Sequence, residues 1–211
     1  MNEMQQKQIK MWDDRYADQS YAYGTAPNVF LVETLDKIEL SGSMLFPAEG
    51  EGRNAVYAAK QGMDVTAFDI STEGKKKALH LAEQESVTIN YEVGNLFELD
   101  VVKKKYDAAA LIYAHFPPHI LPQYHQKIGD LIKSGGYVIL EGFSTGHLPL
   151  REANPKVGGP NKLDMLFSVE SLRNDFSAFE ILQMEEVEVE LNEGLYHNGV
   201  GKVIRFIGKK K

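Results

Sequence analysis

The chain has 211 residues, a formal net charge of −7 at pH 7 and no cysteine. This length suits a single domain that buries a core without disulfides, and the lack of cysteine excludes catalytic thiols and thiolate metal sites. The acidic charge opposes binding to nucleic acid or anionic membranes, the N-terminus is polar, and no segment approaches the ~18 apolar residues of a membrane-spanning helix. We therefore expect a cytoplasmic protein with a small-molecule substrate, and no nucleic acid or membrane partner.

The first 42 residues predict two helices separated by an aromatic loop. Residues 3–17 have helical character and carry Trp12 and Tyr16, and the loop YAYGTAPN follows at residues 21–28. Pro27 suits the first turn of a second helix, which we expect to reach about residue 38. This N-terminal segment is long enough to cover a site built by the residues that follow.

Residues 43–71 predict a strand, a glycine turn, a helix and a second strand that ends in a carboxylate. Gly50 and Gly52 allow a tight turn, and residues 54–61 have helical apolar spacing. Asp69 closes the second strand about 17 residues after Gly52, and a carboxylate near that distance commonly accepts hydrogen bonds from ribose hydroxyls. We therefore expect a ligand that contains adenosine.

Strands and helices alternate through the next 75 residues or so, which indicates a largely parallel sheet with helices on both faces. Ser71 is a candidate N-cap, and Gly135-Gly136 is expected to end the last helix of this part. The expected elements are a helix over residues 72–85, a strand over 87–93, a strand over 106–113, a helix from Pro117-Pro118 to 133 and a strand over 137–143.

The C-terminal part predicts a different arrangement. A loop rich in glycine and proline at residues 144–162 leads to a short helix near 168–175, and the strands over 179–191 and 200–209 form an antiparallel pair. The expected fold is a doubly wound, mostly parallel seven-stranded α/β sheet of the Rossmann type that ends in an antiparallel β-hairpin. We expect one domain, with a cap at 1–42, a cofactor-binding core at 43–143, and an acceptor loop, short helix and hairpin at 144–211.

The charge of the glycine turn indicates which nucleoside it binds. Residues 50–55 (GEGRNA) also fit the dinucleotide fingerprint G-x-G-x-x-A, but Glu49 and Glu51 would then lie beside a diphosphate. S-adenosylmethionine instead presents a sulfonium and an ammonium near the turn, and a carboxylate that the following helix N-terminus can receive. An acidic turn therefore favours S-adenosylmethionine, with the alternative that both glutamates point to solvent.

Several motifs together resemble those of class I S-adenosylmethionine-dependent methyltransferases. The resemblance is to the group related to tellurite-resistance and thiopurine methyltransferases, and it extends over nearly the whole chain. Asn198 departs from the tellurite-resistance proteins, which carry arginine there, and this weakens a prediction of tellurite as substrate. The matching segments are residues 12–16 (WDDRY), 23–31 (YGTAPNVFL), 50–54 (GEGRN), 62–69 (GMDVTAFD) and 196–199 (YHNG).

The resemblance implies which residues bind the cofactor. Asp69 would bind the ribose, Ile70 would pack on the adenine, and Tyr113 would lie near the transferable methyl group. Phe46 and Ala48 depart from the pattern, so the group that holds the cofactor ammonium stays open, with Glu49 as a candidate. The full set of expected cofactor-binding residues is Ala48, Glu49, Gly50, Gly52, Asn54, Asp69, Ile70, Asn95, Leu96 and Tyr113.

Two histidines are candidate general bases for a thiol or chalcogen acceptor. His115 follows the fourth strand and is the first candidate, and His197 in the hairpin connection is the second; for both, a structurally hydrogen-bonded histidine is the alternative. We expect no metal, because Pro117-Pro118 breaks the helical register between His115 and His119. The N-terminal aromatic residues Trp12, Tyr16 and Tyr23 are expected either to close over the acceptor or to pack in the core. Phe116 and Phe143, at the ends of the fourth and fifth strands, are expected to contact the acceptor.

The predicted function is methyl transfer from S-adenosylmethionine to a small, soft acceptor. An enzyme of the same fold with an oxygen or nitrogen acceptor is the near alternative. Two alternatives of other classes are a nicotinamide-dependent oxidoreductase and a noncatalytic protein that binds an adenosine-containing ligand.

Overall fold

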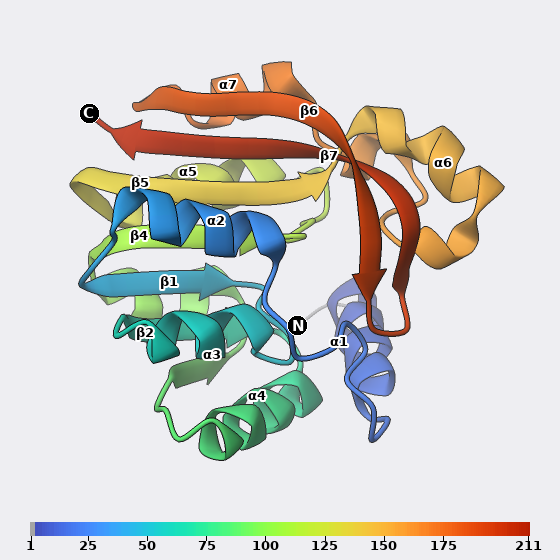
Figure 1. The fold of residues 1–211 in the computed structure, drawn as a ribbon, viewed down its shortest axis with the longest axis horizontal. Helices are drawn as coiled ribbons and strands as arrows, with labels where there is room; N and C mark the ends of the chain where they lie inside the picture. Colours follow the sequence, from blue (N-terminus) through green and yellow to red (C-terminus); the bar gives the residue numbers. More distant parts are fainter. Residues whose placement is uncertain (1–2) are drawn as a thin grey trace.

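The computed structural model describes residues 3–211 as one seven-stranded sheet with helices on both faces (Figure 1). The strands lie in the order β3-β2-β1-β4-β5-β7-β6. Their bounds are β1 Ser43–Pro47, β2 Asp64–Asp69, β3 Asn90–Val93, β4 Tyr106–Ile112, β5 Ile132–Phe143, β6 Phe179–Glu193 and β7 His197–Lys210. The helices are α1 Glu3–Tyr16, α2 Val29–Ile38, α3 Arg53–Lys60, α4 Thr72–Gln84, α5 Leu121–Leu131, α6 Leu148–Ala153 and α7 Val169–Asp175.

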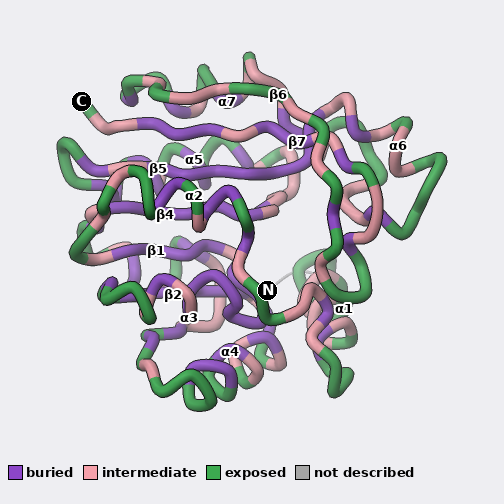
Figure 2. The backbone as a smooth tube through the Cα atoms, viewed as in Figure 1, coloured by how far each residue is buried: buried purple, intermediate pink, exposed green. Residues whose placement is uncertain are grey.

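The sheet confirms the predicted fold class. Strands β1 to β5 pair in parallel, whereas β7 pairs antiparallel with both β5 and β6. Figure 2 shows that the central strands β1, β4 and β5 are buried along most of their length, while β6 is largely half-buried or exposed. Burial on both faces explains why the inner strands are nearly continuous apolar runs.

Alternation of side chains along β1 divides the core into two layers. Met44 and Phe46 pack with residues of α2, α3 and α4, whereas Leu45 points to the opposite face and packs with residues of α5 and α7. Successive side chains of a strand point to opposite faces of the sheet, so three consecutive apolar residues are enough to anchor both layers.

Several predicted boundaries were wrong. Helix α2 begins after Pro27, because Asn28 is the N-cap and its side chain accepts a hydrogen bond from the N–H of Leu31. Helix α5 begins beyond Pro117-Pro118 and ends at Leu131, so Gly135-Gly136 lies within β5. Strand β3 is shorter than expected, and the stretch expected as a loop at 144–162 contains α6.

The C-terminal hairpin is longer than predicted and bends away from the sheet. Its tip reaches the N-terminal segment, where the N–H of Leu195 donates to the carbonyl of Ala22 at 2.8 Å (Figure 1). His197 is the first residue of β7 and not part of the connection. None of the helices described for residues 3–211 has the length and apolar character needed to cross a membrane.

Candidate active site

The site residues gather where the strand order reverses. Strand β1 lies between β2 and β4, and open parallel sheets bind ligands at the carboxyl ends of strands at such a point. The glycine turn follows β1, Asp69 ends β2, and Tyr113 follows β4.

Glu49 caps the helix that follows the glycine turn. Its Oε1 accepts hydrogen bonds from the backbone N–H groups of Asn54 and Ala55, each at 2.8 Å. The helix N-cap, Gly52, has no side chain for this task, so the carboxylate of Glu49 satisfies two N-terminal amides of α3. Two amides of the helix N-terminus that was expected to receive the cofactor carboxylate therefore donate to Glu49.

Glu51 is buried as well. Its Oε1 accepts from Nζ of Lys77 at 2.8 Å, and its Oε2 accepts from the N–H of Ala22 at 2.8 Å. The alternative that Glu49 and Glu51 both point to solvent is wrong, since their exposed fractions are 9% and 5%.

Asp69 lies beside the same turn. It accepts hydrogen bonds from the N–H groups of Gly50 at 3.0 Å and Ser71 at 2.9 Å. Burial, which disfavours a charged carboxylate, raises the pKa of Asp69 to about 6 and the pKa of Glu49 to about 7, although backbone donors partly oppose the shift.

This acidic turn suits a cationic ligand better than a diphosphate. Of the three buried carboxylates, Glu51 has the ammonium of Lys77 as a direct partner, whereas the direct partners of Glu49 and Asp69 are backbone amides. A positive charge near Glu49 and Asp69 would favour their ionised forms. A diphosphate would meet like charge, and it would find the Asn54 and Ala55 amides already bonded to Glu49.

Helix α1 covers the turn. A Cβ placed on Gly50 would lie 2.6 Å from the hydroxyl oxygen of Tyr16, and Trp12 stacks on Tyr16 with ring centroids 5.5 Å apart. Asp13 accepts from the hydroxyl of Ser71 at 2.6 Å and so ties α1 to the start of α4. Trp12 and Tyr16, which were expected to contact the acceptor or to pack in the core, therefore lie beside the glycine turn.

The residues expected around the adenine differ in accessibility. Ile70 and Asn95 are half-buried, and Oδ1 of Asn95 accepts from the N–H of Phe97 at 3.1 Å. Leu96 is fully buried and packs in the core layer beside α5, with Phe68.

A second group of residues meets at the ends of β4 and β5. Tyr113 has a left-handed backbone (φ 53°), and its ring lies 4.9 Å from Phe143 and 4.6 Å from His197 between centroids. Tyr23 lies 4.5 Å from the His197 ring. A residue with a side chain in this conformation is strained, and such strain clusters at functional sites. We call Tyr23, Tyr113, Phe143 and His197 the aromatic cluster.

His115 adjoins this cluster, but both of its ring nitrogens are engaged. Nδ1 donates to the carbonyl of Met165 at 2.9 Å, and Nε2 accepts from the N–H of Phe143 at 3.0 Å. Burial lowers the pKa of His115 to about 3, so the ring is neutral. These contacts favour the structural alternative for His115. Phe116 turns toward Tyr124 of α5, with ring centroids 4.4 Å apart.

His197 differs from His115 because a carboxylate, Glu193, contacts one of its ring nitrogens. Its Nδ1 lies 2.9 Å from Oε2 of Glu193, and the same oxygen accepts from Nη2 of Arg53 at 3.0 Å. Within residues 3–211, no hydrogen-bond partner is found for Nε2 of His197. Burial lowers the pKa of His197, although Glu193 opposes the shift.

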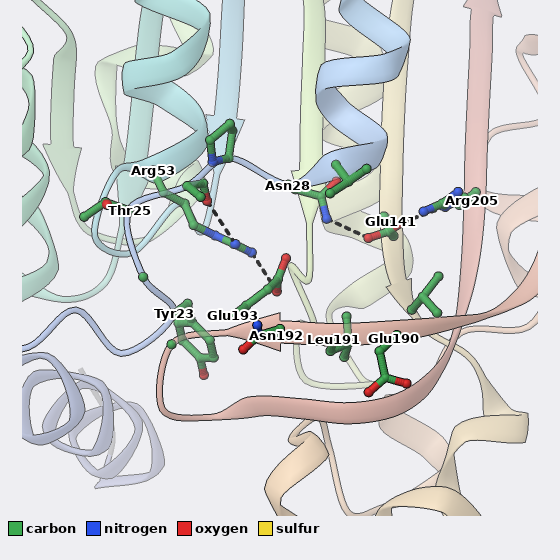
Figure 3. Close-up of a pocket in the computed structure, with 16 residues that line it drawn as sticks. Tyr23, Thr25, Asn28, Arg53, Glu141, Glu190, Leu191, Asn192, Glu193 and Arg205 are labelled. Atoms are coloured by element: carbon green, nitrogen blue, oxygen red, sulfur yellow. Dashed lines mark hydrogen bonds and ion pairs between the residues drawn. The ribbon is translucent and has the colours of Figure 1, made fainter.

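A cavity of about 400 Å³ lies between the N-terminal loop and the curved hairpin (Figure 3). Glu141 is central to its charged wall: it accepts from Nδ2 of Asn28 at 2.6 Å, from Nε of Arg205 at 2.7 Å and from the hydroxyl of Tyr113 at 3.1 Å. Arg53, Glu193 and Tyr23 also line the cavity, so its wall meets the aromatic cluster at Tyr23.

Sequence reasoning missed Arg53, Glu141 and Glu193 as site residues. Glu141 carried a signal, because it is the one charged residue in the buried strand segment YVILEGF, and buried charges need partners. Arg53 belongs to the segment GEGRN at residues 50–54, but no role was assigned to it from the sequence. Glu193 carried no signal beyond its place near the hairpin turn.

The strand order and the acidic turn define a class I S-adenosylmethionine-dependent methyltransferase fold. A family model described as a methyltransferase domain matches residues 47–136 of the chain. No curated protein matches the sequence. The family match thus assigns a methyltransferase domain to residues 47–136, a little under half of the chain, and the fold is that of S-adenosylmethionine-dependent methyltransferases.

Solved structures share this fold at low sequence identity. TehB from Haemophilus influenzae is 18% identical with a TM-score of 0.65, over 96% of this chain and 67% of that chain. Magnesium protoporphyrin IX methyltransferase (ChlM) from Synechocystis PCC 6803 with bound SAH is 16% identical with a TM-score of 0.63, over 100% and 88%. A structure described by "Conversion of a Disulfide Bond into a Thioacetal Group during Echinomycin Biosynthesis" is 18% identical with a TM-score of 0.75, over 97% and 92%.

Proposed function

We propose that this protein methylates a small molecule at a soft atom, most simply a thiol sulfur. The observation that carries the proposal is the aromatic cluster around His197, whose Nδ1 is held by Glu193 while Nε2 has no partner within residues 3–211. A neutral imidazole can accept the proton of a thiol, and sulfur makes favourable contacts with aromatic rings.

We further propose how the chain holds its cofactor. Asp69 would bind the ribose and Glu49 the ammonium, with Ala48, Gly50, Gly52 and Asn54 around the turn. Ile70, Asn95 and Leu96 would surround the adenine, and Tyr113 would lie near the methyl group. When bound, the cofactor supplies a methyl group already activated on a sulfonium, so alignment and exclusion of water are the main tasks of the protein.

The chain's own residues can perform these tasks. Tyr113 and Phe143 limit water around the acceptor, and His197 accepts the acceptor proton at Nε2. The pKa of His197 is lowered by burial, so its imidazole is neutral and able to accept that proton near pH 7. Glu193 stabilises the imidazolium that results, and Arg53 holds the Glu193 carboxylate in place.

Two further observations support a small, soft acceptor. The cavity of about 400 Å³ falls within the range of small-molecule pockets. One structural neighbour is described by the conversion of a disulfide bond into a thioacetal group, which is sulfur chemistry on the same fold.

We also propose that the chain belongs to the group related to tellurite-resistance and thiopurine methyltransferases. The sequence segments behind that resemblance converge in space. Tyr23 contacts His197, Arg15 donates to the hydroxyl of Tyr23 at 2.7 Å, and Arg53 pairs with Glu193.

An oxygen or nitrogen acceptor is the second candidate. The cavity wall favours it, because Arg53, Glu141 and Arg205 offer charged and polar groups to a ligand. The same base at His197 would serve a phenol.

Transfer of a radiolabelled methyl group to a panel of thiols, selenite, tellurite and phenols tests the proposal. We expect label on at least one thiol, and we expect His197→Ala to lower kcat/KM by roughly 10²–10⁴-fold because it removes the proton acceptor. The exposed residue His119 provides a matched control, and His119→Ala should leave the rate unchanged. Label on phenols alone would support the second candidate, and no transfer to any of these acceptors would contradict both.

A further inference from the structure

We propose that Glu193 is a positioning residue that holds the proton of His197 on Nδ1 and thereby keeps Nε2 free to accept a proton from the acceptor. Arg53 holds the Glu193 carboxylate in place. The inference rests on the proposed function, because the role of His197 as base belongs to that proposal.

The geometry converges on one oxygen. Oε2 of Glu193 lies 2.9 Å from Nδ1 of His197 and 3.0 Å from Nη2 of Arg53. A carboxylate only accepts hydrogen bonds, so a contact at this distance places the imidazole proton on Nδ1. The lone pair of the neutral ring then lies on Nε2.

All three side chains are largely withdrawn from water, with exposed fractions of 5% for His197, 8% for Arg53 and 15% for Glu193. Low exposure strengthens the two charge-assisted contacts, because solvent does not compete for the same groups. The pair with Arg53 also lowers the pKa of Glu193 to about 2, along with the hydrogen bond from His197, despite burial. Glu193 is therefore a carboxylate throughout the neutral range.

The ring of His197 is fixed by more than one contact. Tyr23 and Tyr113 lie against it with centroids at 4.5 and 4.6 Å, and Phe143 meets it edge-on at 5.3 Å. The charged groups that act on it are Glu193 from β6, Arg53 from α3 and Arg15 from α1. Of these, Glu193 alone favours the imidazolium.

Arg53 connects the Glu193–His197 pair to the glycine turn. It is the first residue of α3 and follows Gly52 directly, and its Nη1 also donates to the carbonyl of Ala26 at 3.3 Å. One guanidinium thus ties the glycine turn, the N-terminal loop and the hairpin together. The position of His197 in the hairpin therefore depends, through Glu193 and Arg53, on helix α3, which begins at the end of the glycine turn.

The S–H bond of a thiol acceptor breaks, its electron pair stays on sulfur, and the proton forms an N–H bond at Nε2 of His197. The positive charge of the resulting imidazolium lies next to the Glu193 carboxylate, which stays ionised. His115 has no free nitrogen for this step, since Met165 and Phe143 engage both.

Nitrogen-15 NMR of histidine in the free protein tests the inference without any acceptor. In the unaltered protein we expect His197 as the Nδ1–H tautomer. Glu193→Gln keeps an acceptor but removes the charge, so the pKa of His197 should fall. Glu193→Met removes both the acceptor and the charge, so the Nδ1–H tautomer of His197 should no longer be favoured over the Nε2–H tautomer.

Kinetics then connect the tautomer with the reaction. With a thiol from the panel, we expect kcat/KM to fall roughly tenfold in Glu193→Gln and about 10²-fold or more in Glu193→Met, with S-adenosylhomocysteine affinity unchanged. Glu188→Gln alters an exposed glutamate on the same strand and should change neither readout.

The outcomes separate this inference from the proposed function. An Nε2–H tautomer in the unaltered protein, or an unchanged His197 tautomer in a folded Glu193→Met protein, would overturn the role of Glu193 whatever the acceptor is. If Glu193→Met does not fold, Glu193→Gln decides, and an unchanged His197 pKa there would overturn it. A correct tautomer with no methyl transfer to any thiol would contradict the proposed function alone.

Discussion

A protein that carries Gly52→Ala is expected to lose roughly 2–5 kcal/mol of its free energy of unfolding. Gly52 has a left-handed backbone (φ 89°), and an added Cβ would lie 2.6 Å from Cβ and 2.7 Å from Cα of Ala78. Backbone strain and overlap with α4 therefore act together. Gly52 lets α3 and α4 pack closely, which is a structural role beside the expected contact with the cofactor.

Gly62→Ala is the matched control for this substitution. Gly62 has nearly the same backbone (φ 87°), but an added Cβ would meet nothing within 4 Å. Its cost is backbone strain alone, about 1 kcal/mol. Denaturant unfolding of both variants measures the difference, and equal losses would contradict the packing role of Gly52.

The affinity for S-adenosylhomocysteine is expected to rise roughly a hundredfold from about pH 5.5 to about pH 7.5. Burial raises the pKa of Glu49 to about 7 and that of Asp69 to about 6 in the free protein. The ligand's ammonium beside Glu49 and the ribose hydroxyls that donate to Asp69 both favour the ionised carboxyls, so binding lowers both pKa values. Protons are therefore released on binding, and affinity increases as pH rises through this window.

Calorimetry in two buffers of different ionisation enthalpy measures the protons released, and Glu49→Gln should remove the part due to Glu49. The free energy of unfolding of the free protein depends on pH in the opposite direction. Both carboxyls have raised pKa values in the folded state, so the free energy of unfolding falls as they ionise with rising pH. Folding should therefore be checked across the range. A dissociation constant independent of pH, without proton release, would contradict the assignment of Glu49 and Asp69.

The sequence was sufficient to predict the fold class because its main signals were local. The glycine turn, the carboxylate at Asp69 and the alternation of strands and helices each follow from nearby residues. The errors fell where tertiary contacts set a boundary. Residues 132–136 belong to β5 because Ile132 pairs with Tyr106 of β4 and the pairing resumes at Tyr137 after a register shift, and a glycine pair alone did not reveal this.

The site was predicted less completely for the same reason. Tyr113, Phe143 and His197 were expected and do come together, since each lies at an element end that the fold brings to one edge. The partners Glu193 and Arg53 are 140 residues apart, and no local pattern predicts such a pair.

The roles of the two histidines, His115 and His197, could not be distinguished from the sequence. Sequence position favoured His115, because it directly follows the fourth strand. Only the hydrogen bonds to Met165 and Phe143 show that its nitrogens are engaged, whereas among residues 3–211 the ring nitrogens of His197 have a hydrogen-bond partner in Glu193 alone. Position along a strand predicts where a side chain lies, but its chemistry depends on partners from distant segments.

Calorimetric titration of the unaltered protein with S-adenosylmethionine and, separately, with NADH tests most directly whether the acidic turn holds a cationic methyl donor. The account predicts saturable binding of S-adenosylmethionine and no binding of NADH, because the carboxylate of Glu49 would lie beside the diphosphate and already occupies two amides of α3. Binding of NADH without binding of S-adenosylmethionine would contradict it.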